Sequence, residues 1–314
     1  MLSCAKVSAK TPTITIVGPG RLGTALALAL HQNGFTVSEI IGRDEPASRS
    51  RTRSLARRVG ARATTVAGAR LDCDILWICV QDAAIQSCAR TLSQKQADWK
   101  HKIIFHSSGA LTSDELEVLK QRGAATASLH PMMTFVSGAH PSLAGVTFAG
   151  EGDSRALRTA KRIVSRVGGT FVAIEKRAKP MYHAWGAFGS PLLVSLLALA
   201  EEVAAVAGLP AKQARKTIAP MLRRTVENYV EHGPVAAFSG PLVRGDTNTV
   251  RKHLDVLRSL DGAAEVYRAL ADAALRLLPV TRREELESLL KEAQASKTAR
   301  SKSKRVREPL SRGR

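Results

Sequence analysis

Residues 13–23 read TITIVGPGRLG, a β-branched run that leads directly into a G-x-G-x-x-G turn. An Ala- and Leu-rich run follows at once, so the order is strand, glycine turn, helix. In this order the glycines are typical of a dinucleotide-binding turn, where the new helix directs free N–H groups and its positive dipole end at the phosphates. The alternative is a glycine turn that only packs a βα unit. We predict nucleotide binding by Gly18, Gly20, Arg21, Leu22 and Gly23.

Strand-like and helix-like segments alternate through the first half of the chain and end with a strand at 170–174. Such alternation predicts a doubly wound parallel sheet of the α/β class. After residue 176 the hydrophobic periodicity is helical and glycine–proline punctuation divides it, which predicts an all-α C-terminal domain. The predicted boundaries are 12–177 for the nucleotide-binding domain, 178–292 for the helical domain and 293–314 for a disordered basic tail.

The net charge of +20 over 314 residues is concentrated partly in that tail, where eight Lys and Arg accompany one acid between 297 and 314. The tail could contact nucleic acid weakly, although a solvated tail is the simpler interpretation. Aromatic residues make up 4% of the chain, which argues against a base-stacking nucleic-acid surface.

The four cysteines form no CxxC pair and have no histidine at metal-ligand spacing, so we expect no metal site and a reducing compartment. The N-terminus lacks an apolar run of signal-peptide length. The most apolar segment, 184–200, is interrupted by glycines and a proline, which favours a buried helix over a membrane span. We therefore expect a cytoplasmic protein that does not bind membranes.

Arginines follow the second predicted strand. Arg43 comes directly after it, Ser48 and Arg49 are next, and six arginines without an acid stand between 49 and 62. A guanidinium pairs bidentately with a 2′-phosphate, so this pattern favours NADP over NAD, with Arg43 and Ser48 as the contacts. Asp44 keeps NAD open, because an acid at this place binds ribose hydroxyls.

Polar residues follow further predicted strands, where ligands of open α/β sheets lie. Val80, Gln81 and Ser107 are candidate cofactor contacts on these strand ends. Candidate proton donors are grouped at the end of the next strand and at the start of the helical domain: His130, Lys179, His183. For His183 a hydrogen-bonded core histidine is the simpler interpretation.

A polar loop at 239–250 reads SGPLVRGDTNTV. Arg244 is a natural anchor for a carboxylate or phosphate, and Ser239, Asp246 and Thr249 could complete a substrate site. The loop's hydroxyl residues could alternatively cap helices, with Thr249 or Asn248 beginning the helix that follows.

Four motifs occur in order: GPGRLG at 18–23, HPMMTF at 130–135, KPMYHAWGAFGSP at 179–191 and SGPLVRGDTNTV at 239–250. Over about residues 12–290 the chain resembles a bacterial family that joins a Rossmann-like domain to a helical domain of unknown function. That family is similar to 6-phosphogluconate dehydrogenase, ketopantoate reductase and pyrroline-5-carboxylate reductase. The resemblance implies an NADP-linked fold, a homodimer formed through the helical domain and a substrate cleft between domains.

Two departures qualify the resemblance. The chain has Gly189-Ser190-Pro191 where related sequences read Ala-Ser-Asn, and the Lys-x-x-x-Asn pair of hydroxyacid dehydrogenases is absent because His183 follows Lys179 by four residues.

We expect an NADP-dependent oxidoreductase acting on a small carboxylate-bearing substrate with a C=O or C=N bond. The alternatives are a non-catalytic NADP-binding sensor or regulatory module, and a reductase of the same fold that uses a deazaflavin.

Overall fold

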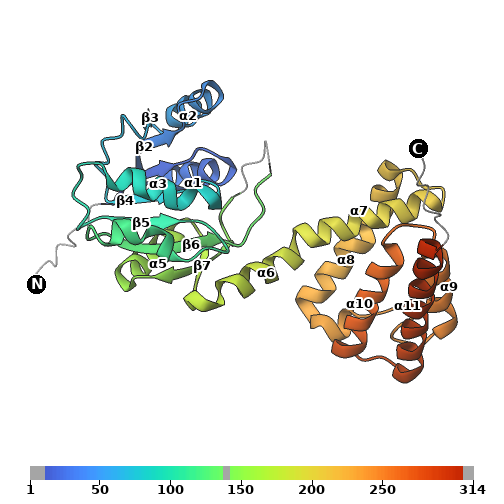
Figure 1. The fold of residues 1–314 in the computed structure, drawn as a ribbon. Coiled ribbons are helices and arrows are strands. Elements are labelled where there is room, and N and C mark those ends of the chain that lie inside the picture. The colour runs from blue at the N-terminus through green and yellow to red at the C-terminus, as the bar shows by residue number, and fades with distance from the viewer. Residues whose placement is uncertain (1–10, 137–141, 307–314) are drawn as a thin grey trace, which may run out of the picture. The chain divides into compact units, whose positions relative to one another are not determined.

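The computed structural model of the protein describes residues 11–136 and 142–306. The chain forms two units, Met1–Pro191 and Leu192–Arg314. The first unit is an eight-stranded sheet flanked by helices (Figure 1). Its strands are β1 Thr13–Val17, β2 Thr36–Gly42, β3 Arg62–Thr65, β4 Ile75–Ile78, β5 Ile103–His106, β6 Ala125–Pro131, β7 Thr147–Gly152 and β8 Thr170–Ala173. Its α-helices are α1 Arg21–Gln32, α2 Pro46–Arg58, α3 Asp82–Ser93, α4 Glu117–Lys120, α5 Ser154–Arg166 and α6 Lys179–Gly189.

The strand order is β3-β2-β1-β4-β5-β6-β7-β8, and every neighbouring pair from β3 to β6 is parallel. The predicted α/β sheet is confirmed. The order reverses between β1 and β4, which are consecutive neighbours in space but not in sequence. Open α/β sheets bind their ligands outside the carboxyl ends of the strands at such a reversal.

One strand pair departs from the predicted parallel arrangement. β7 runs antiparallel to β6, with Leu129 opposite Gly150. A parallel neighbour would need a crossover connection, which is usually a helix. Among its described residues the segment between Pro131 and Thr147 contains no helix, so the chain turns back directly. β8 then pairs in parallel with β7 after the crossover helix α5.

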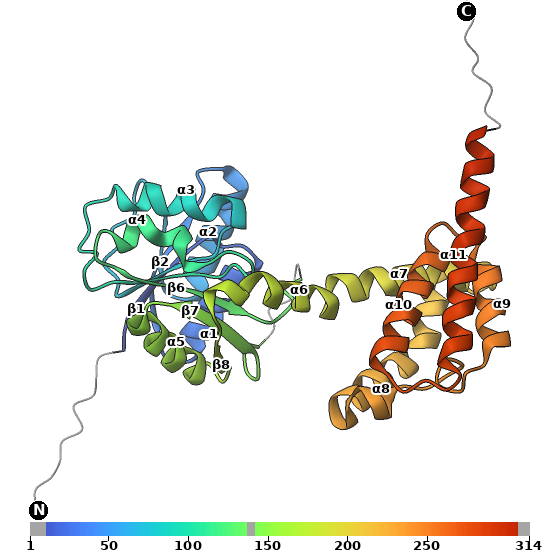
Figure 2. The same cartoon turned by 60° about the horizontal axis from the view of Figure 1, so that its bottom comes forward.

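Helices cover both faces of the sheet. Apolar residues of α1, α2 and α5 form one buried cluster with the strands, and residues of α3 and α4 form a second. Figure 2 shows α3 and α4 on one side of the sheet and α1 and α5 on the other. The strand residues between these layers are almost continuously apolar, as expected of a sheet that is buried on both faces.

Helix α6 belongs to the first unit, so the division of the chain falls after Pro191 and not at the predicted residue 178. The reason is local, because the first residue of α6, Lys179, is fully buried and bonded to the sheet region. Two 3₁₀ turns, Ser113–Leu116 before α4 and Lys176–Ala178 before α6, complete the unit.

The second unit is helical, as predicted. Its helices are α7 Pro191–Val206, α8 Ala211–Ala237, α9 Thr247–Leu257, α10 Ala263–Leu277 and α11 Arg283–Val306. Helix α8 is interrupted at Gly233, whose φ of 78° is left-handed. The buried core joins α9, α10 and α11 through residues such as Leu254, Leu275 and Leu290.

The apolar segment 184–200 is exposed, whereas a buried helix was expected. No residue of α7 is buried, and Val194 is 63% exposed. The stretch Lys176–Val206 is long and apolar enough to cross a membrane by length and composition, because it contains a window of 18 residues with a mean hydropathy of 1.6, although Ser190 separates α6 from α7. Helix α7 therefore presents an apolar surface that is available for an interaction.

The basic tail also differs from its prediction. Helix α11 continues to Val306, whereas disorder was predicted from residue 293. Alanine, lysine, arginine and glutamine have high helix propensity, and no glycine or proline occurs between 293 and 306, so the helix can extend. Residues 307–314 lie outside the described residues.

Candidate functional site

The glycine turn joins β1 to α1 with the geometry that a nucleotide phosphate needs. Gly18 has a φ of 93°, and a Cβ there would lie 2.7 Å from the carbonyl oxygen of Cys79. A Cβ at Gly23 would lie 2.1 Å from the carbonyl oxygen of Gly18, so only glycine lets α1 begin this close. A Cβ at Gly20 would have no atom within 4 Å, which leaves open space for a ligand. The turn therefore fits a pyrophosphate.

Arg21 and Leu22 form the first turn of α1 beside this open space, Arg21 exposed and Leu22 half-buried. Among the residues that the structure describes, no side-chain cap satisfies the α1 N-terminus, because Gly20 occupies the N-cap position. Its first N–H groups are available to an anion.

The end of β2 carries the predicted phosphate contacts. Arg43 is exposed and pairs with Glu45 at 3.3 Å, and Arg49 pairs with Asp44 at 2.7 Å. The hydroxyl of Ser48 accepts the backbone N–H of Arg43 at 3.0 Å and is buried. Ser48 therefore shapes the turn, whereas the guanidinium of Arg43 can exchange a weak surface ion pair for a phosphate.

At the ends of β4 and β5, too, some of the predicted contacts are accessible to a ligand and others are buried. Val80 is half-buried and Gln81 is exposed before α3. Ser107 is buried, and its hydroxyl accepts the indole N–H of Trp77 at 2.8 Å. The Ser107 side chain thus fixes the end of β5.

Lys179 joins the ends of β5 and β6 to α6. Its Nζ donates to the carbonyl oxygen of Ser108 at 2.9 Å and to the hydroxyl of Ser128 at 2.5 Å, and that hydroxyl donates to the same carbonyl at 3.2 Å. Burial lowers the pKa of Lys179 to about 8, and Glu151 and Asp82 offset part of the shift. Lys179 is positioned as an anchor, because its ammonium has no exposed surface.

The turn after β5 is held by hydrogen bonds. The hydroxyl of Ser108 donates to Asp82 at 2.7 Å and accepts the backbone N–H of Leu111 at 2.9 Å. His106 accepts the N–H of Ser108 at Nδ1, so its Nε2 carries the hydrogen that reaches the carbonyl of Thr112 at 2.9 Å. Burial lowers the pKa of His106 to about 4. The imidazole is fixed as one neutral tautomer.

His130 pairs with Tyr182 across β6 and α6. Its Nδ1 lies 3.0 Å from the Tyr182 hydroxyl. Burial, followed by the charge of Lys179, lowers the pKa of His130 to about 4. Burial raises the pKa of Tyr182 to about 12. Both groups are therefore neutral near pH 7, and the pair can hold a proton in either of two arrangements.

His183 and Gly109 close the cluster. The rings of His183 and His130 are 6.1 Å apart, and a Cβ at Gly109 would lie 2.4 Å from Cδ2 of His183 and 3.0 Å from Nε2 of His130. Only glycine fits between the two imidazoles. The three predicted proton donors are thus brought together, with His183 exposed and not in the core.

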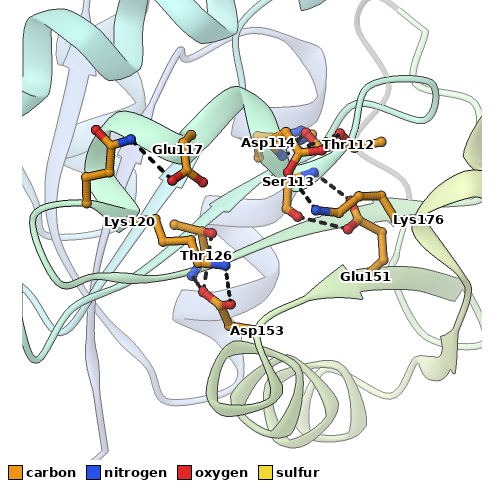
Figure 3. Close-up of polar contacts among 11 residues, drawn as sticks. Thr112, Ser113, Asp114, Glu117, Lys120, Thr126, Glu151, Asp153 and Lys176 are labelled. Atoms are coloured by element: carbon orange, nitrogen blue, oxygen red, sulfur yellow. Dashed lines mark hydrogen bonds and ion pairs between the residues drawn. The ribbon is translucent and has the colours of Figure 1, made fainter.

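A second polar network supports the cluster (Figure 3). The buried carboxylate of Glu151 accepts the backbone N–H of Ser113 at 2.7 Å and its hydroxyl at 2.9 Å. Nearby, Lys176 donates to Asp114 at 2.6 Å, which ties the turn before α6 to the segment after β5. The contact of Lys176 with Asp114 therefore holds the turn before α6 at a second point, besides Lys179.

The predicted substrate loop lies in the second unit. Arg244 and Ser239 are exposed. Asp246 is the N-cap of α9, because it accepts the backbone N–H of Thr249 at 3.0 Å and its hydroxyl at 2.7 Å. The expectation that Thr249 or Asn248 caps this helix is wrong. Asp246 and Thr249 are hydrogen-bonded to each other in the cap. In the loop, Arg244 is the residue that remains suited to an anion.

Sequence reasoning missed Tyr182, Ser128 and the role of Ser108. Tyr182 could have been found, because residues three apart share a helix face and Tyr182 follows Lys179 by three. Ser128 carried no such signal, since it meets Lys179 from 51 residues away. Among the described residues no group of three or more His, Cys, Asp or Glu is arranged to hold a metal ion.

Comparisons with known proteins agree with this architecture. Residues 4–131 match the Rossmann-like domain family, and residues 146–274 match a domain of unknown function, DUF2520. No curated protein has a sequence that matches the chain significantly. The resemblance based on the four motifs is confirmed.

Solved structures share the fold at low identity. A candidate NADP oxidoreductase from Bacteroides fragilis is 21% identical with a TM-score of 0.69, covering 84% of this chain and 97% of its own. A reductive aminase from Aspergillus terreus in complex with NADPH and ethyl-5-oxohexanoate is 14% identical with a TM-score of 0.62, covering 88% and 99%. A pyrroline-5-carboxylate reductase from Coxiella burnetii is 15% identical with a TM-score of 0.56, covering 91% and 98%. The chain therefore combines a Rossmann-like domain with a domain of the DUF2520 family.

Proposed function

We propose that the protein is an NADP-dependent oxidoreductase that reduces a C=O or C=N bond in a small carboxylate-bearing substrate. The observation that carries the proposal is the open space at Gly20, beside the reversal of strand order and at the edge where the cluster around Lys179 lies. A nucleotide fits the turn, and ionisable groups stand at the ends of neighbouring strands. The solved structures of similar fold that are named for NADP or NADPH support the choice of cofactor.

We assign residues along the carboxyl ends of the strands to the parts of NADPH that each would bind. The turn around Gly20 and the N-terminus of α1 would hold the pyrophosphate, and Arg43 would pair with the 2′-phosphate. NADPH supplies a hydride when bound. The buried Ser107 and Ser108 turn would form one wall of the site and exclude water from it.

The proton that accompanies reduction is assigned to Tyr182. When neutral His130 carries its hydrogen on Nδ1, it donates to the phenol oxygen, and the phenolic hydrogen is free for a substrate atom. That hydrogen bond stabilises the phenolate that remains. Lys179 holds the turn beside the pair, because its buried ammonium donates hydrogen bonds to Ser108 and Ser128.

We assign the substrate's acid group to Arg244. Its guanidinium is exposed, and a guanidinium binds a carboxylate in a bidentate way. Arg244→Ala is expected to raise the KM for substrate and to leave NADPH affinity unchanged. Unchanged substrate kinetics would remove this role.

We also propose that the protein is a cytoplasmic homodimer joined through α7 and α8. Large apolar side chains are exposed on both helices, among them Val194 at 63% and Val230 at 75%. Exposed apolar surface of this extent marks an interaction site. The free thiols of Cys73, Cys79 and Cys88 suit a reducing compartment.

The first experiment is a fluorescence titration of the protein with NADPH and, in parallel, with NADH. Micromolar binding of NADPH with much weaker NADH binding would support the cofactor and the role of Arg43. A panel of keto acids and cyclic imino acids would then be screened for NADPH oxidation. No binding of either nucleotide would overturn the proposal, and binding without turnover of any substrate would favour a sensor.

A further inference from the structure

Helix α5 carries cations without counter-charges. Between Ser154 and Arg166 it has five cations and no acid: Arg155, Arg158, Lys161, Arg162, Arg166. In the part of the chain that the structure describes, none of the five forms an ion pair. Arg158, Arg162 and Arg166 follow one another at intervals of four, so like charges face each other on one side of the helix and repel. A bound anion would relieve this repulsion.

A cavity of about 430 Å³ lies beside these arginines. It opens where β1, β4 and β5 begin, which is the opposite edge of the sheet from the glycine turn. Its volume is within the range of small-molecule sites. Four apolar residues and two arginines provide most of its wall: Phe35, Ile75, Ile103, Ile163, Arg162, Arg166.

The two arginines are held in place by protein groups. Arg166 donates through Nε to the carbonyl oxygen of Asn33 at 2.8 Å, and its guanidinium carbon lies 4.7 Å above the ring of Phe35. Arg162 donates to the hydroxyl of Thr159 at 3.4 Å. Pre-positioned guanidinium groups lose less entropy when they bind an anion.

Among the described residues that line the same cavity there is one acid, Asp74, which accepts hydrogen bonds from the backbone N–H of Thr13 at 2.7 Å and from its hydroxyl at 2.9 Å. These hydrogen bonds direct its carboxylate to the start of β1. The two arginines outnumber it, and Arg158 adds positive charge on the adjoining surface of α5. The cavity therefore favours a ligand with negative charge.

We infer that this cavity binds a small amphipathic anion, a carboxylate or phosphate attached to an apolar group. The anion would pair with Arg162 and Arg166, and the apolar group would lie against Phe35, Ile75 and Ile103. The site lies away from the nucleotide turn, so the protein can hold both ligands at once. This inference does not depend on the proposed oxidoreductase activity.

The test is isothermal titration calorimetry of the full-length protein with phenyl phosphate, and with inorganic phosphate as the ligand that lacks an apolar group. Both titrations are made with and without saturating NADPH. Arg162→Gln removes one anion contact, and Arg90→Gln is the matched control. Arg90 is also an exposed helical arginine with one hydrogen bond to a side chain of its own helix, Gln86.

Phenyl phosphate is expected to bind the wild-type protein and Arg90→Gln equally, and Arg162→Gln about tenfold more weakly, which corresponds to one lost charge-assisted contact. Inorganic phosphate is expected to bind about tenfold or more weakly than phenyl phosphate. Loss of phenyl phosphate binding in the presence of NADPH would place it in the nucleotide site and overturn the inference. Equal affinity for both ligands, or equal affinity of the two variants, would also overturn it. Binding of a single-stranded oligonucleotide without binding of phenyl phosphate would assign α5 to nucleic acid instead.

Discussion

The phenol oxygen of Tyr182 lies 3.0 Å from Nδ1 of His130, although 52 residues separate the two in the chain. The second unit contains a pair of the same kind, in which the Tyr267 oxygen lies 3.1 Å from Nδ1 of His253. Both pairs have ring centroids 5.7 Å apart. Only the first pair stands beside a buried lysine at the ends of the parallel strands. The second pair is therefore an internal control for the first.

Tyr182→Phe removes the hydroxyl and keeps the aromatic ring. We expect kcat for NADPH oxidation to fall by about 100-fold or more, because general acid catalysis contributes about that much. The affinity for NADPH should stay within about twofold, since Tyr182 is assigned to no cofactor contact. Stopped-flow absorbance at 340 nm would measure the hydride-transfer rate. Tyr267→Phe loses the same kind of hydrogen bond and should keep full activity; equal losses in both variants would mean that Tyr182 is structural.

Two glycines of the turn should respond differently to alanine. Gly20→Ala meets no protein atom within 4 Å, so its thermal stability should be unchanged while NADPH binding weakens about tenfold or more. Gly23→Ala places its Cβ 2.1 Å from the Gly18 carbonyl oxygen and should lower the free energy of unfolding by about 1–3 kcal/mol. Urea unfolding and NADPH titration of both variants separate these effects. A stable Gly20→Ala protein with unimpaired binding would contradict the placement of the pyrophosphate.

Arg43→Ala tests the preference between the two nicotinamide cofactors. The guanidinium would pair with a group that NADPH has and NADH lacks. We expect affinity for NADPH to fall by about tenfold, a typical value for one lost charge-assisted contact, with NADH affinity unchanged. Arg53→Ala, on helix α2, which begins three residues after Arg43, serves as the control for general charge. Parallel losses for both nucleotides would show that Arg43 acts only through overall electrostatics.

Acid should destabilise the protein through its buried histidines. Burial holds the pKa of His106 at about 4, below the ordinary value of 6.5, so the unfolded chain takes up this proton first as the pH falls. The free energy of unfolding should therefore decrease between pH 6.5 and 4, by roughly 2–3 kcal/mol for this group. His106→Gln should show a smaller decrease over the same range in urea unfolding.

Light scattering coupled to size-exclusion chromatography measures the proposed dimer. The wild-type protein should elute with twice the mass of the chain, and Val194→Lys should shift it towards the monomer because a charge would be buried in the interface. Val256 of α9 is exposed to a similar extent, 66% against 63%, and Val256→Lys should remain dimeric. A monomeric wild-type protein would refute the dimer. Co-flotation with lipid vesicles would then assign the apolar surface to a membrane.

The parts of the fold that sequence analysis predicted are those that local chemistry determines. The glycine turn follows from the spacing of Gly18, Gly20 and Gly23 within one βα unit, and strand positions follow from short apolar runs. The direction of β7 carries no such signal, because an apolar strand has the same pattern whichever way it runs. The cap of α9 was missed for a related reason: Asp246 and Thr249 are both good N-caps, and only the backbone geometry selects between them.

The candidate site was predicted in part. His130, Lys179 and His183 are indeed neighbours, because each stands at a strand end or helix start on one edge of the sheet. Which residue is a structural anchor and which can donate a proton depends on contacts between residues far apart in the chain, and the sequence pattern does not reveal these contacts. Lys179 is an anchor because Ser108 and Ser128 accept its hydrogen bonds, and the half-buried Tyr182 is the hydrogen-bond partner of His130.

The antiparallel turn between β6 and β7 coincides with the border between the two family segments. The Rossmann-like match ends at residue 131, the last of β6, and the DUF2520 match begins at 146, one residue before β7. The segment that matches DUF2520 therefore contributes β7 and β8, the last two strands at one edge of the sheet. A gene fragment beginning at 146 would express these strands with a bare hydrogen-bonding edge and would tend to aggregate. Recombination at that border would break a continuous β-ladder, so the two segments are suited to inheritance as a single piece.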